Sequence, residues 1–249
     1  YPQAVMTGIA DSGRQAMWPA GKEFYAAPET FGPILDHPQG PLLVRNNIYQ
    51  AVIGGAAGII CYEGSGFDAA RYPAFHAEMV KLRDEFVGAG NLGAVVLSPD
   101  PPQVVTHRIV SGPISKISLD EFENVRSYDR MQYHLEVYQG NVYLLAANIA
   151  ADALTVEFSG LPSAAASVEA LFEGGRTVPL AGGVFSDSFG PYAVHVYRAT
   201  ATLPAGFALA VDAPKRGLVT NQPHLTVSGS VTPISAVTVN GASVAVASS

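Results

Sequence analysis

Apolar positions form two kinds of pattern along the first 90 residues, a helical spacing and short continuous runs. A spacing of three to four residues places apolar side chains on one helical face, and it occurs at 4–18, 44–56 and 68–86. Two short apolar runs lie between these segments, at 23–27 and 58–62, and are typical of buried strands. The order helix, strand, helix, strand, helix predicts parallel strands joined by crossover helices.

Two parallel strands are too few to cover their own faces. We therefore expect residues 1–90 to be the end of a larger α/β domain and to pack against polypeptide that supplies further strands. A closed core confined to this segment would contradict that interpretation.

The pattern changes to a period of two between residues 92 and 198. Glycine, proline and asparagine separate the alternating runs, and hairpin turns are indicated at 139–141 and 173–175. Roughly seven or eight short strands in about 105 residues are typical of an antiparallel β-sandwich. The predicted strands are 134–138, 142–148, 154–158, 168–172, 176–180, 183–189 and 193–197. The residues expected between its two sheets are Phe158, Leu171, Phe185, Val194 and Val196.

A third change follows residue 200. Segments rich in proline and glycine at 203–206 and 213–217 precede two strand patterns, at 225–231 and 237–244. The dipeptide Asn240-Gly241 is a strong signal for a two-residue hairpin. The chain thus divides into predicted domains 1–90, 91–200 and 201–249.

Composition excludes several classes of protein. The chain is 48% hydrophobic and 14% charged, which argues against global disorder. Its 14 Lys and Arg against 21 Asp and Glu give a net charge of −7, so nucleic acid is an unsuitable partner. No apolar run is long enough for a membrane helix. The single Cys61 allows no internal disulfide, the histidines lack metal-ligand spacing, and we expect no metal or cofactor.

Three stretches together resemble a known arrangement. KEFYAAPE at 22–29 resembles strand 7, and RNNIYQAVIGGAAGIICY at 45–62 resembles the helix 7 to strand 8 passage, of clan-A-type (β/α)8-barrel glycoside hydrolases. DSFGPYAVHVYR at 187–198 resembles the last strand of the small β-sandwich that often follows such barrels. Residues 204–249 resemble the start of a bacterial immunoglobulin-like module.

The resemblance implies an α/β plus all-β fold: strands 7 and 8 of a TIM barrel, an antiparallel sandwich and a partial Ig-like module. The other six βα units would then come from the missing N-terminal portion of the same protein, on the same or a separate chain. The start at Tyr1, without an initiator Met, is interpreted as a mature, processed or partial chain. The resemblance also implies a secreted or cell-surface protein.

Glycoside hydrolysis needs two carboxyl groups, which barrel enzymes place at the carboxyl ends of strands. Glu29 follows the first predicted strand, and the resemblance implies that it is the nucleophile; a sugar contact and a structural role are the alternatives. Glu63 follows the second strand and is a candidate for sugar binding or charge tuning, with catalysis or a solvated loop position as alternatives. The general acid/base, expected at strand 4, would precede Tyr1.

Further residues are candidates for substrate binding. Tyr25, Tyr62 and Phe67 could stack on a sugar face, although a core position explains the last two equally well. Asp36 and His37, in the long loop after the first strand, are candidates for a subsite, with exposed loop polarity as the alternative. His195, on an alternating strand, is expected to be a satisfied sandwich residue.

These observations predict a glycoside hydrolase that acts on a polysaccharide or oligosaccharide by a two-carboxylate, retaining mechanism. The alternative is a non-catalytic carbohydrate-binding or cell-surface module. A second carboxylate about 5 Å from Glu29 would favour the enzyme, and its absence would favour the binding module.

Overall fold

The computed structural model divides the chain into two compact units, Tyr1–Ala201 and Thr202–Ser249. Each unit is described by itself. The residues that the structure describes are 6, 9–10, 13, 17, 23–28, 30, 32–61, 68–98, 101, 103–119, 124–202, 208–213, 228–232, 237–239 and 242–244.

The first unit contains the predicted pair of parallel strands. β1 (Tyr25–Ala26) pairs with β2 (Gly58–Ile59) in the register Tyr25↔Gly58 and Ala26↔Ile59. The crossover includes α2 (Pro33–Asp36) and α3 (Gly40–Ile53), and α4 (Pro73–Phe86) follows β2. The predictions of helices at 44–56 and 68–86 and of parallel strands are therefore confirmed. Most of the helix predicted at 4–18 lies outside the described residues.

The strands predicted after residue 130 are all present and form two antiparallel sheets. One sheet has the order β10-β9-β12-β7-β6 and the other the order β11-β8-β3. Their bounds are β3 Thr106–Ser111, β6 Met131–Tyr138, β7 Asn141–Asn148, β8 Leu154–Ser159, β9 Ser167–Ala170, β10 Thr177–Pro179, β11 Val184–Phe189 and β12 Val194–Thr200. The sequence pattern did not predict β3, the β4–β5 hairpin (Ser115–Leu119 and Val125–Asp129) or α5 (Leu92–Val96).

The core between the two sheets differs in part from the prediction. Phe158 and Phe185 lie there, as expected. Val194 and Val196 instead pack with the helices on the outer face of the five-stranded sheet, and Leu171 packs against the same cluster. The reason is that β12 is covered on both faces, and its alternate residues Tyr197 and Ala199 fill the sandwich core.

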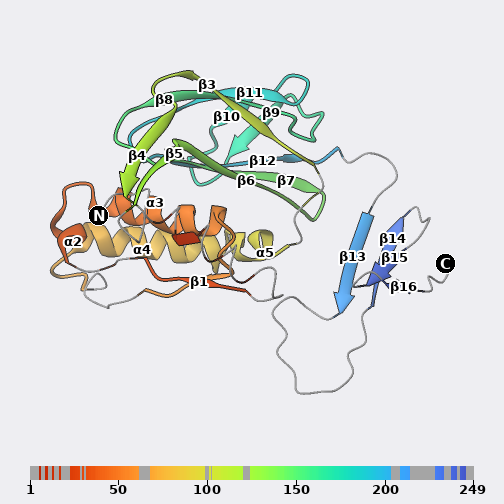
Figure 1. The fold of residues 1–249 in the computed structure, drawn as a ribbon, viewed down its shortest axis with the longest axis horizontal. Coiled ribbons are helices and arrows are strands. Elements are labelled where there is room, and N and C mark those ends of the chain that lie inside the picture. The colour runs from red at the N-terminus through yellow and green to blue at the C-terminus, as the bar shows by residue number, and fades with distance from the viewer. Residues whose placement is uncertain are drawn as a thin grey trace. The chain divides into compact units, whose positions relative to one another are not determined.

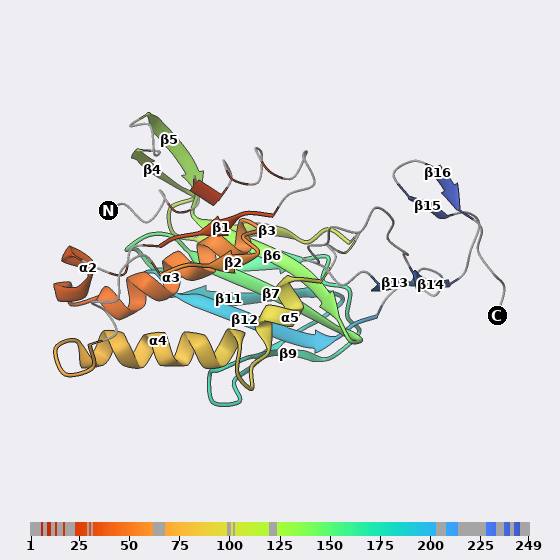
Figure 2. The ribbon, with the colours of Figure 1, turned by 90° about the horizontal axis from the view of Figure 1, so that it is seen from below.

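The layers follow one another from the three-stranded sheet to the five-stranded sheet and then to the helices, with β1 beyond them (Figure 1). α3 contacts β6, β7 and β12, whereas α4 packs chiefly on α3 and α5. α3 thus makes the main junction with the five-stranded sheet, and Phe75, Met79 and Leu82 of α4 belong to the same buried cluster as residues of β7 and β12. Figure 2 shows α3 and α4 running side by side along the sheet.

α3 is buried on nearly all sides because it lies between two layers. Ala51 packs with Phe24 and Ala26 of the parallel pair, while Val44 and Ile48 share a core with the five-stranded sheet. Asn46 Nδ2 donates to the carbonyl oxygens of Asn148 and Tyr192, 3.0 Å away in each case. The polar side chains of this helix thus hold the α/β segment against the sandwich.

The second unit consists, among its described residues, of two antiparallel strand pairs. β13 (Ala208–Ala213) pairs with β14 (Ser228–Thr232). β15 (Val237–Val239) pairs with β16 (Ala242–Val244), and the partners Val239↔Ala242 leave two residues for the connection. This register agrees with the hairpin predicted at Asn240-Gly241, residues that themselves lie outside the described ones. Among the described helices of the chain, none has the length and apolar character needed to cross a membrane.

Candidate functional site

The carboxyl edge of the parallel pair is the candidate site that the sequence predicts. Backbone N–H groups of Ala57 and Ile60 donate to the carbonyls of Phe24 and Ala26, both at 2.9 Å, and fix the two strands side by side. Glu29 and Glu63 follow these strands in the sequence. Both carboxylates lie outside the described residues, as do Tyr62 and Phe67, so their predicted roles stay predictions.

Tyr25 extends from the face of β1 that α3 does not cover. Its neighbours Phe24 and Ala26 point into the core around α3, and alternation along the strand directs Tyr25 the opposite way. Tyr25 is 61% exposed, and Ile60, just after β2, is 58% exposed. A Cβ atom on Gly58 would lie 2.5 Å from the Tyr25 ring, so a larger residue at this paired position would force the ring to move. Large apolar side chains thus stand uncovered on this face.

Asp36 and His37 line a cleft of about 340 Å³. Its opposite wall is the turn before α4, which contributes Arg71 and Tyr72. The guanidinium of Arg71 lies 5.0 Å from the centre of the Tyr72 ring. The cleft therefore combines a carboxylate, an imidazole, a cation and an aromatic ring, a set that can hydrogen-bond and stack on a polar ligand.

Short local hydrogen bonds shape both walls of this cleft. Asp68 Oδ1 accepts the N–H groups of Ala70 and Arg71, at 3.0 and 3.1 Å, which closes the turn. His37 Nδ1 accepts the N–H of Gln39 at 3.1 Å. Sequence reasoning identified Asp36 and His37 but missed Arg71 and Tyr72. The signal that could have found them is the turn-forming Asp68 ahead of an aromatic residue and Pro73.

A buried polar network fixes α4 against α3 and so positions that cleft. Arg45 Nη1 donates to Glu78 Oε1 at 3.0 Å and to Glu85 Oε1 at 2.9 Å. The Tyr49 hydroxyl donates to Glu85 Oε2 at 2.7 Å, and burial is the main cause that raises the pKa of Tyr49. Part of the polar pattern that carries the family resemblance thus serves helix packing here.

An apolar groove of about 590 Å³ runs between α3, β2, α4 and α5. Val52, Ile59, Met79 and Phe86 are among its lining residues. Cys61 also lines it, and partial burial raises the pKa of the Cys61 thiol. Ile59 of β2 lines the groove together with residues of the three helices.

His195 is held within the sandwich, as expected for a satisfied residue. Its Nδ1 lies 2.6 Å from Glu173 Oε1 and 3.3 Å from Arg176 Nη2. Arg176 also donates to Glu173 Oε2 and to Asp187 Oδ2, both at 2.7 Å. Among the described residues, no three His, Cys, Asp or Glu side chains are grouped so that they could hold a metal ion.

No family model matches the sequence, and no curated protein matches it either. Solved structures that it resembles include the following glycoside hydrolases. A family 30 endoxylanase from Clostridium papyrosolvens shares 13% identity, over 74% of this chain and 43% of that one, with a TM-score of 0.39. A family 30 subfamily 8 xylanase from Clostridium acetobutylicum shares 12% identity, over 74% and 44%, with a TM-score of 0.41.

An Anoxybacillus α-amylase shares 11% identity with this chain, over 82% of this chain and 46% of that one, with a TM-score of 0.40. The chain spans less than half the length of each of these three enzymes.

Proposed function

We propose that this chain is the C-terminal part of a glycoside hydrolase that cleaves a polysaccharide or oligosaccharide. The observation that carries the proposal is the parallel pairing of β1 with β2 across the α3 crossover. Barrel enzymes place their catalytic side chains just after the carboxyl ends of such strands. Glu29 and Glu63 hold those positions in the sequence of this chain.

In this proposal Glu29 is the nucleophile, and the reaction retains the configuration of the sugar. The Glu29 carboxylate attacks the anomeric carbon while an acid from the preceding part of the barrel protonates the departing oxygen. Water then releases the sugar from Glu29, and the same acid group acts as the base. Glu63 binds sugar hydroxyls, and Tyr25, Tyr62, Phe67, Asp36 and His37 contact the substrate around it.

The partner in this proposal is the polypeptide that supplies the other barrel strands. Three features support it: the exposed Tyr25 and Ile60 on one face of the parallel pair, the apolar groove beside β2, and a parallel sheet that has two strands among the described residues. A secreted or cell-surface location is proposed on the sequence resemblance alone.

The test is hydrolysis by the complete protein with matched substitutions. Glu29→Gln keeps the side-chain shape and removes the attacking charge, so turnover should fall by about three orders of magnitude while sugar binding survives. Glu63→Gln should chiefly raise KM. Released products from xylan, starch, galactan and mixed-linkage glucan are measured by chromatography. Near-normal turnover of Glu29→Gln would remove it from the mechanism, and sugar binding without cleavage would favour the binding-module alternative.

A further inference from the structure

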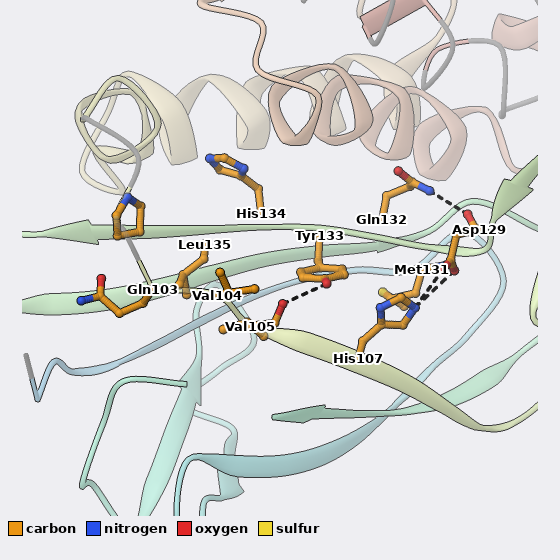
Figure 3. A pocket seen from close by; sticks show the side chains of 11 residues that line it. Gln103, Val104, Val105, His107, Asp129, Met131, Gln132, Tyr133, His134 and Leu135 are labelled. Atoms are coloured by element: carbon orange, nitrogen blue, oxygen red, sulfur yellow. Dashed lines mark hydrogen bonds and ion pairs between the residues drawn. The ribbon is translucent and has the colours of Figure 1, made fainter. Parts of the chain in front are cut away.

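A second cleft of about 520 Å³ lies at the open edge of the sandwich, well away in sequence from Glu29. Its walls are the segment that leads into β3 and the edge strand β6 (Figure 3). The lining residues used below are Gln103, His107, Asp129, Gln132 and Tyr133.

Asp129 is the polar centre of this cleft. Its Oδ2 lies 3.1 Å from His107 Nε2, and its Oδ1 accepts the N–H of Met131 at 3.0 Å. Burial alone would raise the pKa of Asp129, but these two partners lower it, so the group stays a carboxylate. The side chain is nevertheless 48% exposed. An oriented carboxylate with lone pairs open to the cleft accepts hydrogen bonds from neighbouring hydroxyl groups.

Aromatic and amide groups lie close to this carboxylate and are held in place. The Tyr133 hydroxyl donates to the carbonyl of Val105 at 3.0 Å, and its ring meets that of His107 at 5.0 Å between centroids. Gln132 Nε2 donates to the Asp129 carbonyl at 2.7 Å. Figure 3 shows the Tyr133 and His107 rings on the same side of β6, near Asp129. The cleft thus offers a fixed ring surface beside fixed polar groups.

One polar atom of the cleft has no protein partner among the described residues. Gln103 Oε1 is buried and accepts no hydrogen bond from them. A buried acceptor without a donor is unfavourable, and because this oxygen is not exposed, a ligand hydroxyl group could satisfy it only after the Gln103 side chain turns outward.

We propose that this cleft binds a neutral sugar segment of the polysaccharide substrate, outside the catalytic site. Its ligand class rests on the proposed function, whereas the site rests on the geometry above. The Asp129 carboxylate disfavours anionic ligands, and its Oδ2 already has His107 Nε2 as a partner. Paired hydroxyl groups beside an apolar sugar face match the Asp129 carboxylate and the Tyr133 and His107 rings, which lie on one side of β6, whereas Gln132 lies on the other (Figure 3).

The experiment observes the cleft directly. The 249-residue chain, with 13C-labelled His and Tyr rings, is titrated by NMR with xylohexaose, maltohexaose, cellohexaose and galactotetraose. We expect at least one of these sugars to shift the His107 and Tyr133 ring signals in a saturable way. Asp129→Ala should weaken that binding at least about tenfold, because it removes a charged hydrogen-bond acceptor. The control Asp84→Ala removes an exposed carboxylate on α4 and should leave the affinity unchanged.

Thermal melting of each variant separates loss of binding from loss of folding, since Asp129 lies at the surface. If none of the four sugars shifts these signals, or if a folded Asp129→Ala variant binds as tightly as the unsubstituted chain, the inference is overturned. Glu29→Gln separates the two proposals: it should abolish turnover of the complete protein and leave sugar binding at this cleft intact. A complete protein that cleaves its substrate while none of the four sugars binds at this cleft would refute this inference alone.

Discussion

Arg45 shows how one residue joins two helices of this protein. It contacts Glu78 and Glu85 of α4 while Tyr49, one turn later on α3, donates to Glu85. Replacing one member of such a buried set leaves the others desolvated and unpaired. The sequence places these charges in apolar helices, but their pairing could not be predicted, because it depends on how α3 and α4 pack together.

Glu85→Ala should therefore lower the free energy of unfolding by about 3 kcal/mol. The matched control is Asp84→Ala, which removes only an exposed pair with Arg83 and should change it by less than about 0.5 kcal/mol. Urea unfolding followed by circular dichroism measures both values. Equal effects of the two substitutions would show that the network does not hold the helices together.

The lowered pKa of Glu173 predicts how the stability of the fold depends on pH. Burial opposes ionisation of Glu173, but hydrogen bonds from His195 and Arg176 lower its pKa below the ordinary value of 4.5. A carboxylate with a lowered pKa in the folded state stabilises the fold above its unfolded pKa, and this contribution is lost as pH falls through the folded one. Glu173→Gln should thus lower Tm at pH 6, and the difference should shrink toward pH 3. A constant difference from pH 3 to pH 6 would contradict the proposed linkage.

The β6–β7 hairpin lies where the sequence predicted a hairpin, with β6 beginning three residues earlier than the predicted strand. Its two-residue turn has positive φ at Gln139, 48°, and at Gly140, 74°, as a type I′ turn requires. Gly140→Ala should destabilise the protein by about 1 kcal/mol, and Gln139→Asn should stabilise it by a few tenths, since asparagine adopts this conformation more readily. Chemical denaturation measures both changes, and opposite signs would argue against this turn type.

The elements that the sequence pattern missed lack a readable pattern for different physical reasons. The strands β4 and β5 form a separate two-stranded hairpin with exposed apolar positions such as Ile117 and Val125, so no buried face imposes a readable alternation. α5 is an apolar run of five residues, which periodicity cannot distinguish from a buried strand. The sequence predicted β12, but both of its faces are covered. Alternation along the strand therefore could not show which of its residues enter the sandwich core.

At the scale of the whole molecule, the helices pack on the outer face of the five-stranded sheet. The face of the parallel pair that carries Tyr25 and Ile60 is exposed. The parallel order of β1 and β2 and their crossover helix could be predicted from helical periods that alternate with short apolar runs. The cleft that joins Asp36 with Arg71 could not, because it depends on how two loops far apart in sequence meet.

The alkylation rate of Cys61 tests whether the groove beside β2 is covered in the complete protein. Its thiol lines the apolar groove that the remaining barrel strands would cover. Alkylation by iodoacetamide at pH 8 should be at least about tenfold slower in the complete protein than in the 249-residue chain, since covered thiols react slowly. The Cys61 thiol of both proteins should react fully in urea, which shows that the reagent is active in each sample. Equal rates in the two folded proteins would mean that the groove is not a barrel contact.

The covalent state of Glu29 during turnover tests the central claim most directly. The complete protein is incubated with activated 2-deoxy-2-fluoro glycosides of glucose, xylose and galactose, which accumulate a glycosyl-enzyme when the nucleophile is a carboxylate. Proteolysis and mass spectrometry then locate the added sugar. We predict one fluoroglycosyl unit on the peptide that contains Glu29, and none after Glu29→Gln. An adduct on a different carboxylate, or undiminished hydrolysis by Glu29→Gln, would contradict the account.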